Sequence, residues 1–149
     1  MAISASGLYV ATFVDVLDTT QLALDLDLET HKVALFSNSV TPNYTTDTAY
    51  GVSPYNANEV SGTGYTSGGA LLTGTTFTGS AGVATFDASD VSWTSSTITG
   101  ARGALIYADA LAGNNAIVMV SLGADYSTSA GTLAITWSAS GIFTLTLAA

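Results

Sequence analysis

The sequence contains no cysteine and few charged residues. Without cysteine, a disulfide framework and a thiolate metal site are both excluded, which fits folding in a reducing cytosol. Charged residues make up 9% of the chain, compared with about 25% in typical globular domains. With 48% hydrophobic residues, the composition is the opposite of that of disordered chains. The surface must therefore be built largely from hydroxyl and amide groups.

Basic residues are the scarcest charged type. Lys32 and Arg102 stand against 11 acidic residues, and the formal net charge is −9. Nucleic-acid binding needs lysine and arginine to displace counterions from phosphates, and attraction to an anionic membrane surface needs the same residues. The composition therefore predicts a protein with neither a nucleic-acid partner nor a membrane partner.

Targeting and membrane-spanning segments are also missing. The first residues, "MAISASGLYVATFVDVLD", have no basic n-region, and Asp15 and Asp18 interrupt their apolar stretch, which is not typical of a signal peptide. No run of about 18 apolar residues occurs, so no transmembrane helix is predicted. We expect synthesis in the cytoplasm without Sec-type export.

What is present favours one β-domain covering residues 1–149, a length sufficient for a substantial core. The stretch "HKVALFS" predicts a strand at 31–37. After Gly69, apolar or alternating runs recur roughly every ten residues, separated by turn sequences such as "GSAG" and "AGNN". Short strands at this spacing predict an all-β fold, a jelly-roll-like antiparallel β-sandwich of about eight strands.

Residues 1–24 are predicted to form an N-terminal arm that is either helical or extended. The spacing of Tyr9, Phe13, Val16 and Leu17 resembles one face of a short helix, with Ser6 as its N-cap. Many β-branched residues in this segment favour the extended alternative, because they lose side-chain freedom in a helix.

The next segment, "LALDLDLE", alternates leucines with Asp25, Asp27 and Glu29. This period of two predicts an extended stretch, apolar on one face and acidic on the other, that leads into the strand at 31–37. The acidic face is either solvated or a binding surface for a cation or for a basic patch on a partner.

Residues 38–69 form a long excursion rich in Ser, Thr, Asn, Gly and Tyr, and they include both prolines. Long loops in compact domains are usually functional or interface-forming, and tyrosine is enriched at interfaces. We therefore predict that this excursion and the N-terminal arm form most contacts with neighbouring proteins. The candidate interface residues are Tyr9, Phe13, Tyr44, Tyr50, Tyr55, Tyr65 and Arg102.

Catalytic and ligand-binding patterns are weak. His31 is the only histidine, no Gly-x-Ser-x-Gly stretch occurs, and a strand would point Lys32 to the opposite face. We expect His31 near the surface at the start of its strand. Asp87 and Asp90 in "FDASDVSW" suit turns better than an acid pair or a calcium site. The glycine-rich "GTGYTSGG" opens no helix and has no nearby lysine, so we interpret it as a loop or bulge rather than a phosphate site. No catalytic residue, cofactor or metal is predicted.

Two tryptophans and one arginine remain. Trp93 and Trp137 are predicted to be core residues, and an exposed sugar-binding platform is the alternative. Arg102 lies in "RGALIYA" on the predicted strand face of Ala104 and Ile106. A buried charge must be paired, so we expect Arg102 to pair with Asp87 or Asp90 or to contact another chain.

Four stretches of the chain, taken together, carry a resemblance to a known family. They are "DLDLETHKVALFSNSVTPNY", "NEVSGTGYTSGGALL", "ATFDASDVSWTSSTITGARGALIY" and "GTLAITWSASGIFTLTL". In this order and at these spacings they resemble small virion structural proteins of tailed bacteriophages, including actinobacteriophage proteins of the capsid-decoration or minor-capsid type. The resemblance covers about residues 25–147, and its motifs mark strands and turns rather than catalytic groups.

The resemblance implies a protein without enzymatic activity that binds the assembled major capsid lattice and stabilises it on the outside of the virion. It further implies a homo-oligomer, with a trimer favoured. Two alternatives stay open at this point. One is a structural role in the tail or head–tail junction, and the other is a module that binds the host surface or a carbohydrate.

Overall fold

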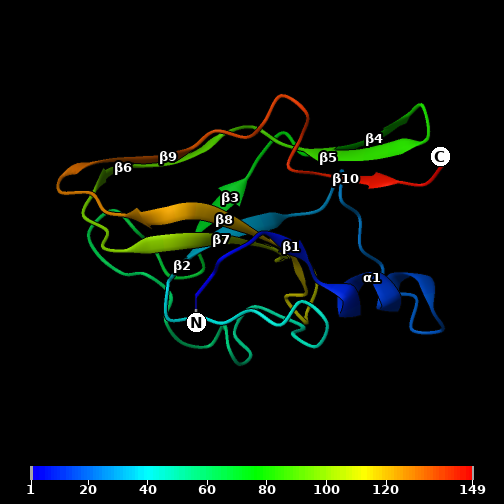
Figure 1. The fold of residues 1–149 in the computed structure, drawn as a ribbon, viewed down its shortest axis with the longest axis horizontal. Helices are drawn as coiled ribbons and strands as arrows, with labels where there is room; N and C mark the ends of the chain where they lie inside the picture. Colours follow the sequence, from blue (N-terminus) through cyan, green and yellow to red (C-terminus); the bar gives the residue numbers. More distant parts are fainter. Residues whose placement is uncertain (1, 149) are drawn as a thin grey trace.

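A computed structural model describes residues 2–148. Its central layer is an antiparallel sheet in the order β1-β8-β7-β2-β3 (Figure 1). The five strands of this central sheet are β1 (Gly7–Leu8), β2 (His31–Ser37), β3 (Ala70–Leu72), β7 (Ala101–Ala108) and β8 (Ala116–Tyr126).

Within residues 2–148, no helix has the length and hydropathy needed to cross a membrane.

Two smaller antiparallel sheets form a second layer. One has the order β10-β5-β4 and the other pairs β6 with β9. Because β5 leads directly into β6 and β9 into β10, the two small sheets lie end to end along one side of the central sheet (Figure 1). Their strands are β4 (Thr76–Ser80), β5 (Val83–Asp87), β6 (Val91–Ser96), β9 (Gly131–Ile135) and β10 (Phe143–Thr146).

The prediction of an all-β antiparallel sandwich is confirmed. The described residues contain ten strands rather than about eight. The first run after Gly69, "ALLTGTTFT", is divided between β3 and β4, which belong to different sheets. The short β1 pairs with β8 at Gly7↔Met119 and Leu8↔Val118.

The main core lies between the two layers. Val33 and Leu35 from β2 and Ile106 from β7 meet Phe86 from β5 and Trp93 from β6, and all five are buried. Large apolar side chains from two opposed sheet faces are the usual filling of a sandwich.

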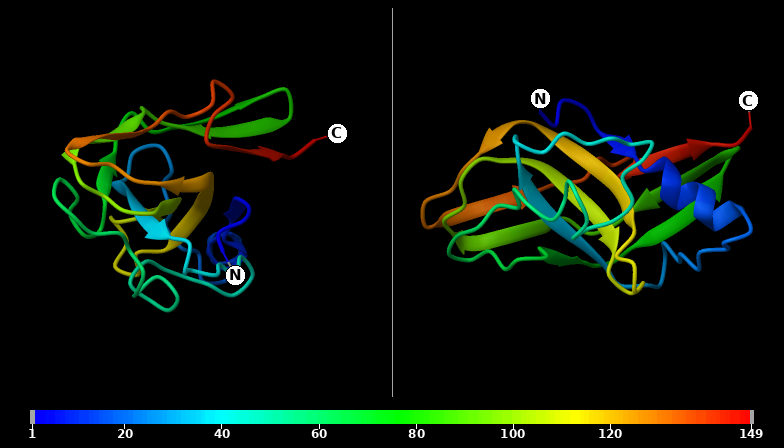
Figure 2. Two further views of the ribbon diagram at one scale, coloured as in Figure 1. Left: turned by 60° about the vertical axis from the view of Figure 1, so that its left-hand side comes forward. Right: turned by 90° about the horizontal axis from the view of Figure 1, so that it is seen from below.

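The opposite face of the central sheet is covered by irregular chain. Ala34 and Phe36 of β2 and Leu105 of β7 are fully buried beneath residues 38–69 and the N-terminal arm, which Figures 1 and 2 show wrapped along this side. Burial on both faces explains why β2 and β7 appear in the sequence as continuous apolar runs rather than as alternating ones.

Of the two alternatives for the N-terminal arm, the structure contains the helix, α1 (Val10–Leu17), but the predicted cap is wrong. Tyr9 occupies the N-cap position without a side-chain hydrogen bond, whereas the Ser6 hydroxyl accepts a hydrogen bond from the Ser121 N–H. Ile3 and Tyr9 are 0% exposed, and the Thr12 hydroxyl donates to the Ala116 carbonyl. Much of the arm is therefore part of the core rather than a free extension.

The extended stretch predicted over residues 22–29 is not a strand. The Asp25 carboxylate accepts hydrogen bonds from the N–H groups of Asp27 and Leu28, so the chain turns at this point. These two bonds lower the pKa of Asp25. A strand would have placed Leu26 and Leu28 on the same face, whereas the turn buries Leu26 and leaves Leu28 84% exposed.

The glycine-rich stretch at residues 62–69 allows the excursion to approach the sheet closely. Gly69 has a φ of +79°, and a Cβ atom there would lie 1.8 Å from the Val33 carbonyl oxygen. Only glycine fits this position, because both the backbone angle and the space exclude a side chain. The stretch therefore closes the excursion onto β2, in agreement with its interpretation as a loop.

We predict that Gly69→Ala lowers the free energy of unfolding by more than about 2 kcal/mol, since the strain of a positive φ adds to a clash with backbone. Gly51→Ala is the matched control, with a φ of +82° and no atom within 4 Å of the place that an alanine methyl group would occupy. The control should lose only about 1 kcal/mol. Urea unfolding of the two variants measures the difference, and equal losses would contradict the close-approach explanation.

Candidate functional site

Asp87 and Asp90, for which turns were favoured over an acid pair or a calcium site, hydrogen-bond to the backbone. The Asp87 carboxylate accepts a hydrogen bond from the Ala88 N–H, and the Asp90 carboxylate accepts one from the Trp137 N–H. In the part of the chain that the structure describes, no three His, Cys, Asp or Glu side chains are grouped to hold a metal ion.

His31 begins β2 as predicted, but the expectation that it lies near the surface is wrong. The side chain is 0% exposed, and its Nε2 atom lies 3.0 Å from the Asp25 carbonyl oxygen. Its ring packs edge-on against Phe86, with ring centres 6.1 Å apart. Burial lowers the pKa of His31. Lys32 points the other way and pairs with Asp109 at 3.1 Å.

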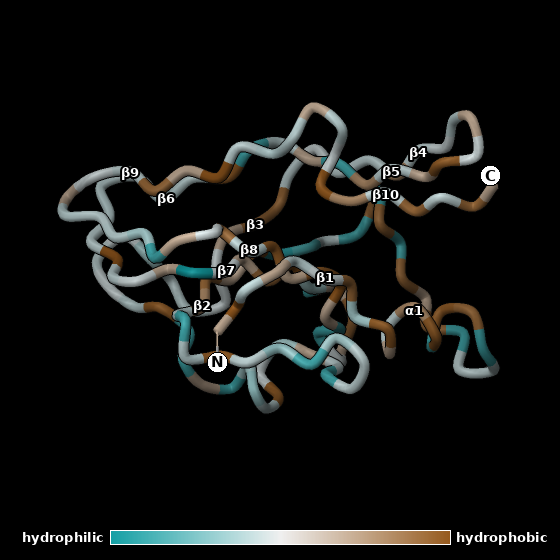
Figure 3. Tube along the Cα trace, in the orientation of Figure 1, coloured by the Kyte–Doolittle hydropathy of each residue, from teal (hydrophilic) through white to brown (hydrophobic). Residues whose placement is uncertain are grey.

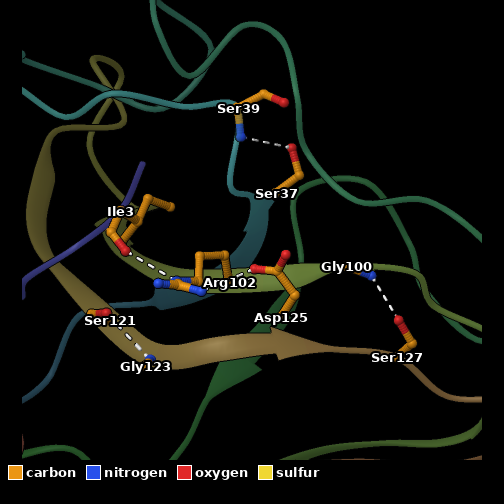
Figure 4. A network of polar contacts seen from close by, with 9 residues as sticks. All are labelled: Ile3, Ser37, Ser39, Gly100, Arg102, Ser121, Gly123, Asp125 and Ser127. Atoms are coloured by element: carbon orange, nitrogen blue, oxygen red, sulfur yellow. Dashed lines mark hydrogen bonds and ion pairs between the residues drawn. The ribbon is translucent and has the colours of Figure 1, made fainter. Parts of the chain in front are cut away.

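Arg102 is paired, although not with the predicted partners (Figure 4). Its guanidinium contacts Asp125 at 3.2 Å and donates to the Ile3 carbonyl oxygen at 3.1 Å. Asp87 and Asp90 lie in the second layer, whereas the strand that carries Asp125 pairs directly with β7. The register of this pairing shifts between Ala101 and Gly103, so Arg102 sits in a bulge. Arg102 thus fastens the N-terminal arm to the sheet.

Two candidate interface residues are buried within the chain itself. Tyr9 is 0% and Tyr55 2% exposed, and the Tyr9 hydroxyl donates to that of Tyr55, which in turn donates to the Asp47 carboxylate. Neither ring is available to a neighbouring protein in this fold, so their assignment as interface residues is wrong. Their rings fill the space between the arm and the excursion.

The other tyrosines of the excursion are half-buried, and their hydroxyls donate hydrogen bonds within the chain. Tyr50 and Tyr65 donate to the Glu59 carboxylate, as do the Ser67 hydroxyl and the Gly68 N–H. Tyr44 donates to the Ala5 carbonyl oxygen. Because four donors satisfy the Glu59 carboxylate, this cluster stabilises the excursion. Contacts of Tyr44, Tyr50 and Tyr65 with a neighbouring protein stay a prediction.

The tryptophans do not form a common platform. Trp93 is 5% exposed and packs in the main core, as predicted. Trp137 is half-buried, and its indole N–H donates to the Ser89 carbonyl oxygen. A flat sugar-binding surface built from both rings is therefore absent from the described structure.

Helix α1 is apolar on nearly all sides, which is its most informative property. One face packs on the body of the molecule, where Phe13 meets Phe143 edge-on with ring centres 6.1 Å apart. The outer face carries Val10, Val14 and Leu17, which are 48%, 49% and 86% exposed. A helix that is hydrophobic all round normally has protein on all sides. This helix has such a composition but is covered on one side only.

A groove of about 770 Å³ opens between α1, the segment that follows it and the three-stranded sheet. Figures 1 and 2 place α1 beneath this sheet at one end of the molecule, and Figure 3 shows that hydrophobic residues predominate along α1 and alternate with less hydrophobic ones along β10. The apolar residues that line the groove include Phe13, Leu17, Leu24, Leu26, Leu145 and Leu147.

A second groove of about 520 Å³ runs along the other side of α1 and shares Phe13, Leu17 and Leu145 with the first. Of the seven candidate interface residues, only Phe13 lies in these two grooves. Sequence reasoning did not identify Leu17, Leu145 and Leu147 as candidates. The available signal was the nearly complete hydrophobicity of residues 10–17, which exceeds what a helix with a single buried face requires.

The rim of the larger groove is acidic. Asp25, Asp27 and Glu29 line it, and Asp25 and Asp27 are exposed. The Asp25 N–H donates to the Glu29 carboxylate, so the turn described above holds these acids together beside the apolar floor. The site is thus an open apolar groove with negative charge along one side.

Neither a protein-family model, nor a curated protein sequence, nor a solved structure matches this chain. The expected relation to phage virion proteins therefore stays a prediction from the four sequence stretches quoted above.

We predict that acidification destabilises the protein partly through His31. Burial lowers the pKa of His31 in the folded state, so the unfolded chain binds a proton first as the pH falls below about 6.5. The stabilising effect of keeping this ring neutral is therefore complete above that pH and is lost below it. Urea unfolding at about pH 7.5 and about pH 5 should show a larger loss for the wild type than for His31→Gln. Equal losses would contradict this role.

Proposed function

We propose that this chain is a non-enzymatic structural protein that docks on the surface of an assembled protein shell. The observation that carries the proposal is the pair of apolar grooves around α1. Exposed apolar grooves bordered by polar residues are found at protein-interaction sites. The residues that chemistry would need are instead engaged in turns, in the core and in ion pairs.

The shell that fits best is a bacteriophage capsid, with the major capsid protein as the partner. This step rests on the resemblance in sequence, which covers about residues 25–147. In this proposal the protein decorates and stabilises the exterior of the virion. Its low charge content and hydroxyl-rich surface support a role in packed assemblies, since few long side chains lose freedom when such a surface is covered. A homo-oligomer, with a trimer favoured, would match the symmetry of a capsid.

The test is stoichiometric binding to particles that lack this protein. We expect purified protein to sediment with such capsids and to saturate at a copy number fixed by capsid symmetry. Saturation at a few copies per particle would instead favour the tail or head–tail junction, and absence of binding would contradict the proposal.

The groove is tested in the same assay with two leucine variants. Leu17→Ser removes an apolar side chain from both grooves, and we expect capsid affinity to fall about tenfold, the effect of losing one buried leucine. Leu28→Ser is the matched control, because Leu28 is 84% exposed and lies outside both grooves. Equal binding by the two variants would place the contact elsewhere on the molecule.

A further inference from the structure

We infer that the grooves around α1 bind a segment of a partner protein in which apolar side chains are flanked by lysine or arginine. This inference rests on the proposed function only in taking the grooves as a docking surface. The chemistry of the occupant follows from three features of the site, which are its extent, its charge and the absence of a complementary charge in the chain itself.

The extent of the apolar surface favours a polypeptide segment. The grooves of about 770 Å³ and 520 Å³ lie on opposite sides of α1 and are joined by Phe13, Leu17 and Leu145. The exposed Val10 and Val14 on the outer face of the helix line the smaller groove. A small ligand would fill one groove and leave the other uncovered, whereas an amphipathic segment lying across α1 covers both.

The charge of the site favours a basic segment. Asp25, Asp27 and Glu29 line the larger groove, and Asp18 lines the smaller one. Backbone N–H groups of Asp27 and Leu28 fix the Asp25 carboxylate in place. An occupant with its own acidic residues would place like charges together beside an apolar contact, which is unfavourable.

A second copy of the chain does not fit this surface. Each copy has a formal net charge of −9 and only two basic side chains. Both are already paired, Lys32 with Asp109 at 3.1 Å and Arg102 with Asp125 at 3.2 Å. Oligomerisation of this chain would therefore use another surface, and the acidic rim is left for a partner that supplies positive charge.

The first experiment selects ligands without assuming a partner. A library of random short peptides is selected by mRNA display on the full-length protein, and binders that also bind Leu17→Ser are removed. We expect the remaining peptides to be enriched in apolar residues together with lysine and arginine, and depleted of aspartate and glutamate. Enrichment of acidic or uncharged peptides would overturn the inference, as would failure to recover any groove-dependent peptide.

The second experiment measures the charge contribution with the best-enriched peptide by fluorescence anisotropy. The single variant Asp27→Asn should weaken binding about two- to threefold at low ionic strength, with a smaller effect at high salt. Asp125→Asn is the matched control. It also removes a negative charge, but at the opposite end of β8 from α1, and it leaves an oxygen to accept from Arg102. Equal effects of the two changes would show that only the net charge matters and would overturn the assigned rim.

Other occupants give distinct results. Concentration-dependent dimerisation that Leu17→Ser abolishes would identify a second copy as the occupant and overturn the inference. Groove-dependent binding to vesicles of neutral phosphatidylcholine would identify a lipid instead and would also overturn it. Failure of the proposed function is separable, because peptide selection succeeds or fails independently of whether the protein sediments with capsids.

Discussion

The central sheet is apolar on both faces, and the rest of the structure follows from the need to cover both. One face is covered in the ordinary way by opposed strands. The other face is covered by residues 38–69 and the N-terminal arm. Irregular chain brings unpaired polar groups with it, and burying these without partners is costly. The internal hydrogen bonds of the excursion supply most of these partners, and the buried Asn38 Oδ1 is an exception.

The Glu59 carboxylate accepts more of these side-chain and backbone hydrogen bonds than any other group described in the excursion. It accepts from two tyrosine hydroxyls, one serine hydroxyl and one backbone N–H, and charge-assisted hydrogen bonds of this kind are the stronger ones. Tyr107, from the sheet beneath, donates to the Gly68 carbonyl oxygen and stacks on Tyr50 with ring centres 4.5 Å apart. Tyrosine is abundant here because its ring covers apolar strands while its hydroxyl satisfies the loop. The N-terminal arm packs with the excursion on this face of the central sheet and places α1 beside the second layer. The two apolar grooves lie on either side of α1 at this position.

The sequence predicted the strands well because turn sequences and apolar runs are local signals. It did not predict which residues lie across from one another. Arg102 was assigned to Asp87 or Asp90, but the partner depends on strand order, which places β8 next to β7. Tyr9 and Tyr55 were assigned to an interface because a tyrosine-rich loop is typical of one, and only the tertiary fold shows that their rings close an internal core. The acidic residues 25–29 were recognised as a possible partner surface, whereas their position beside an apolar groove depends on the turn that replaces the expected extended stretch.

The position of the N-terminal arm has a consequence for how the protein is made. Gly7 and Leu8 pair with β8, Tyr9 donates its N–H to the Ile117 carbonyl oxygen, and β5 pairs with β10 near the end of the chain. During synthesis, residues 7–9 leave the ribosome long before β8 has been made, so they have no strand to pair with until then. Contacts so distant in sequence slow folding, and an uncovered apolar α1 is exposed in the meantime. Folding of this domain is accordingly completed only after both β8 and β10 have left the ribosome.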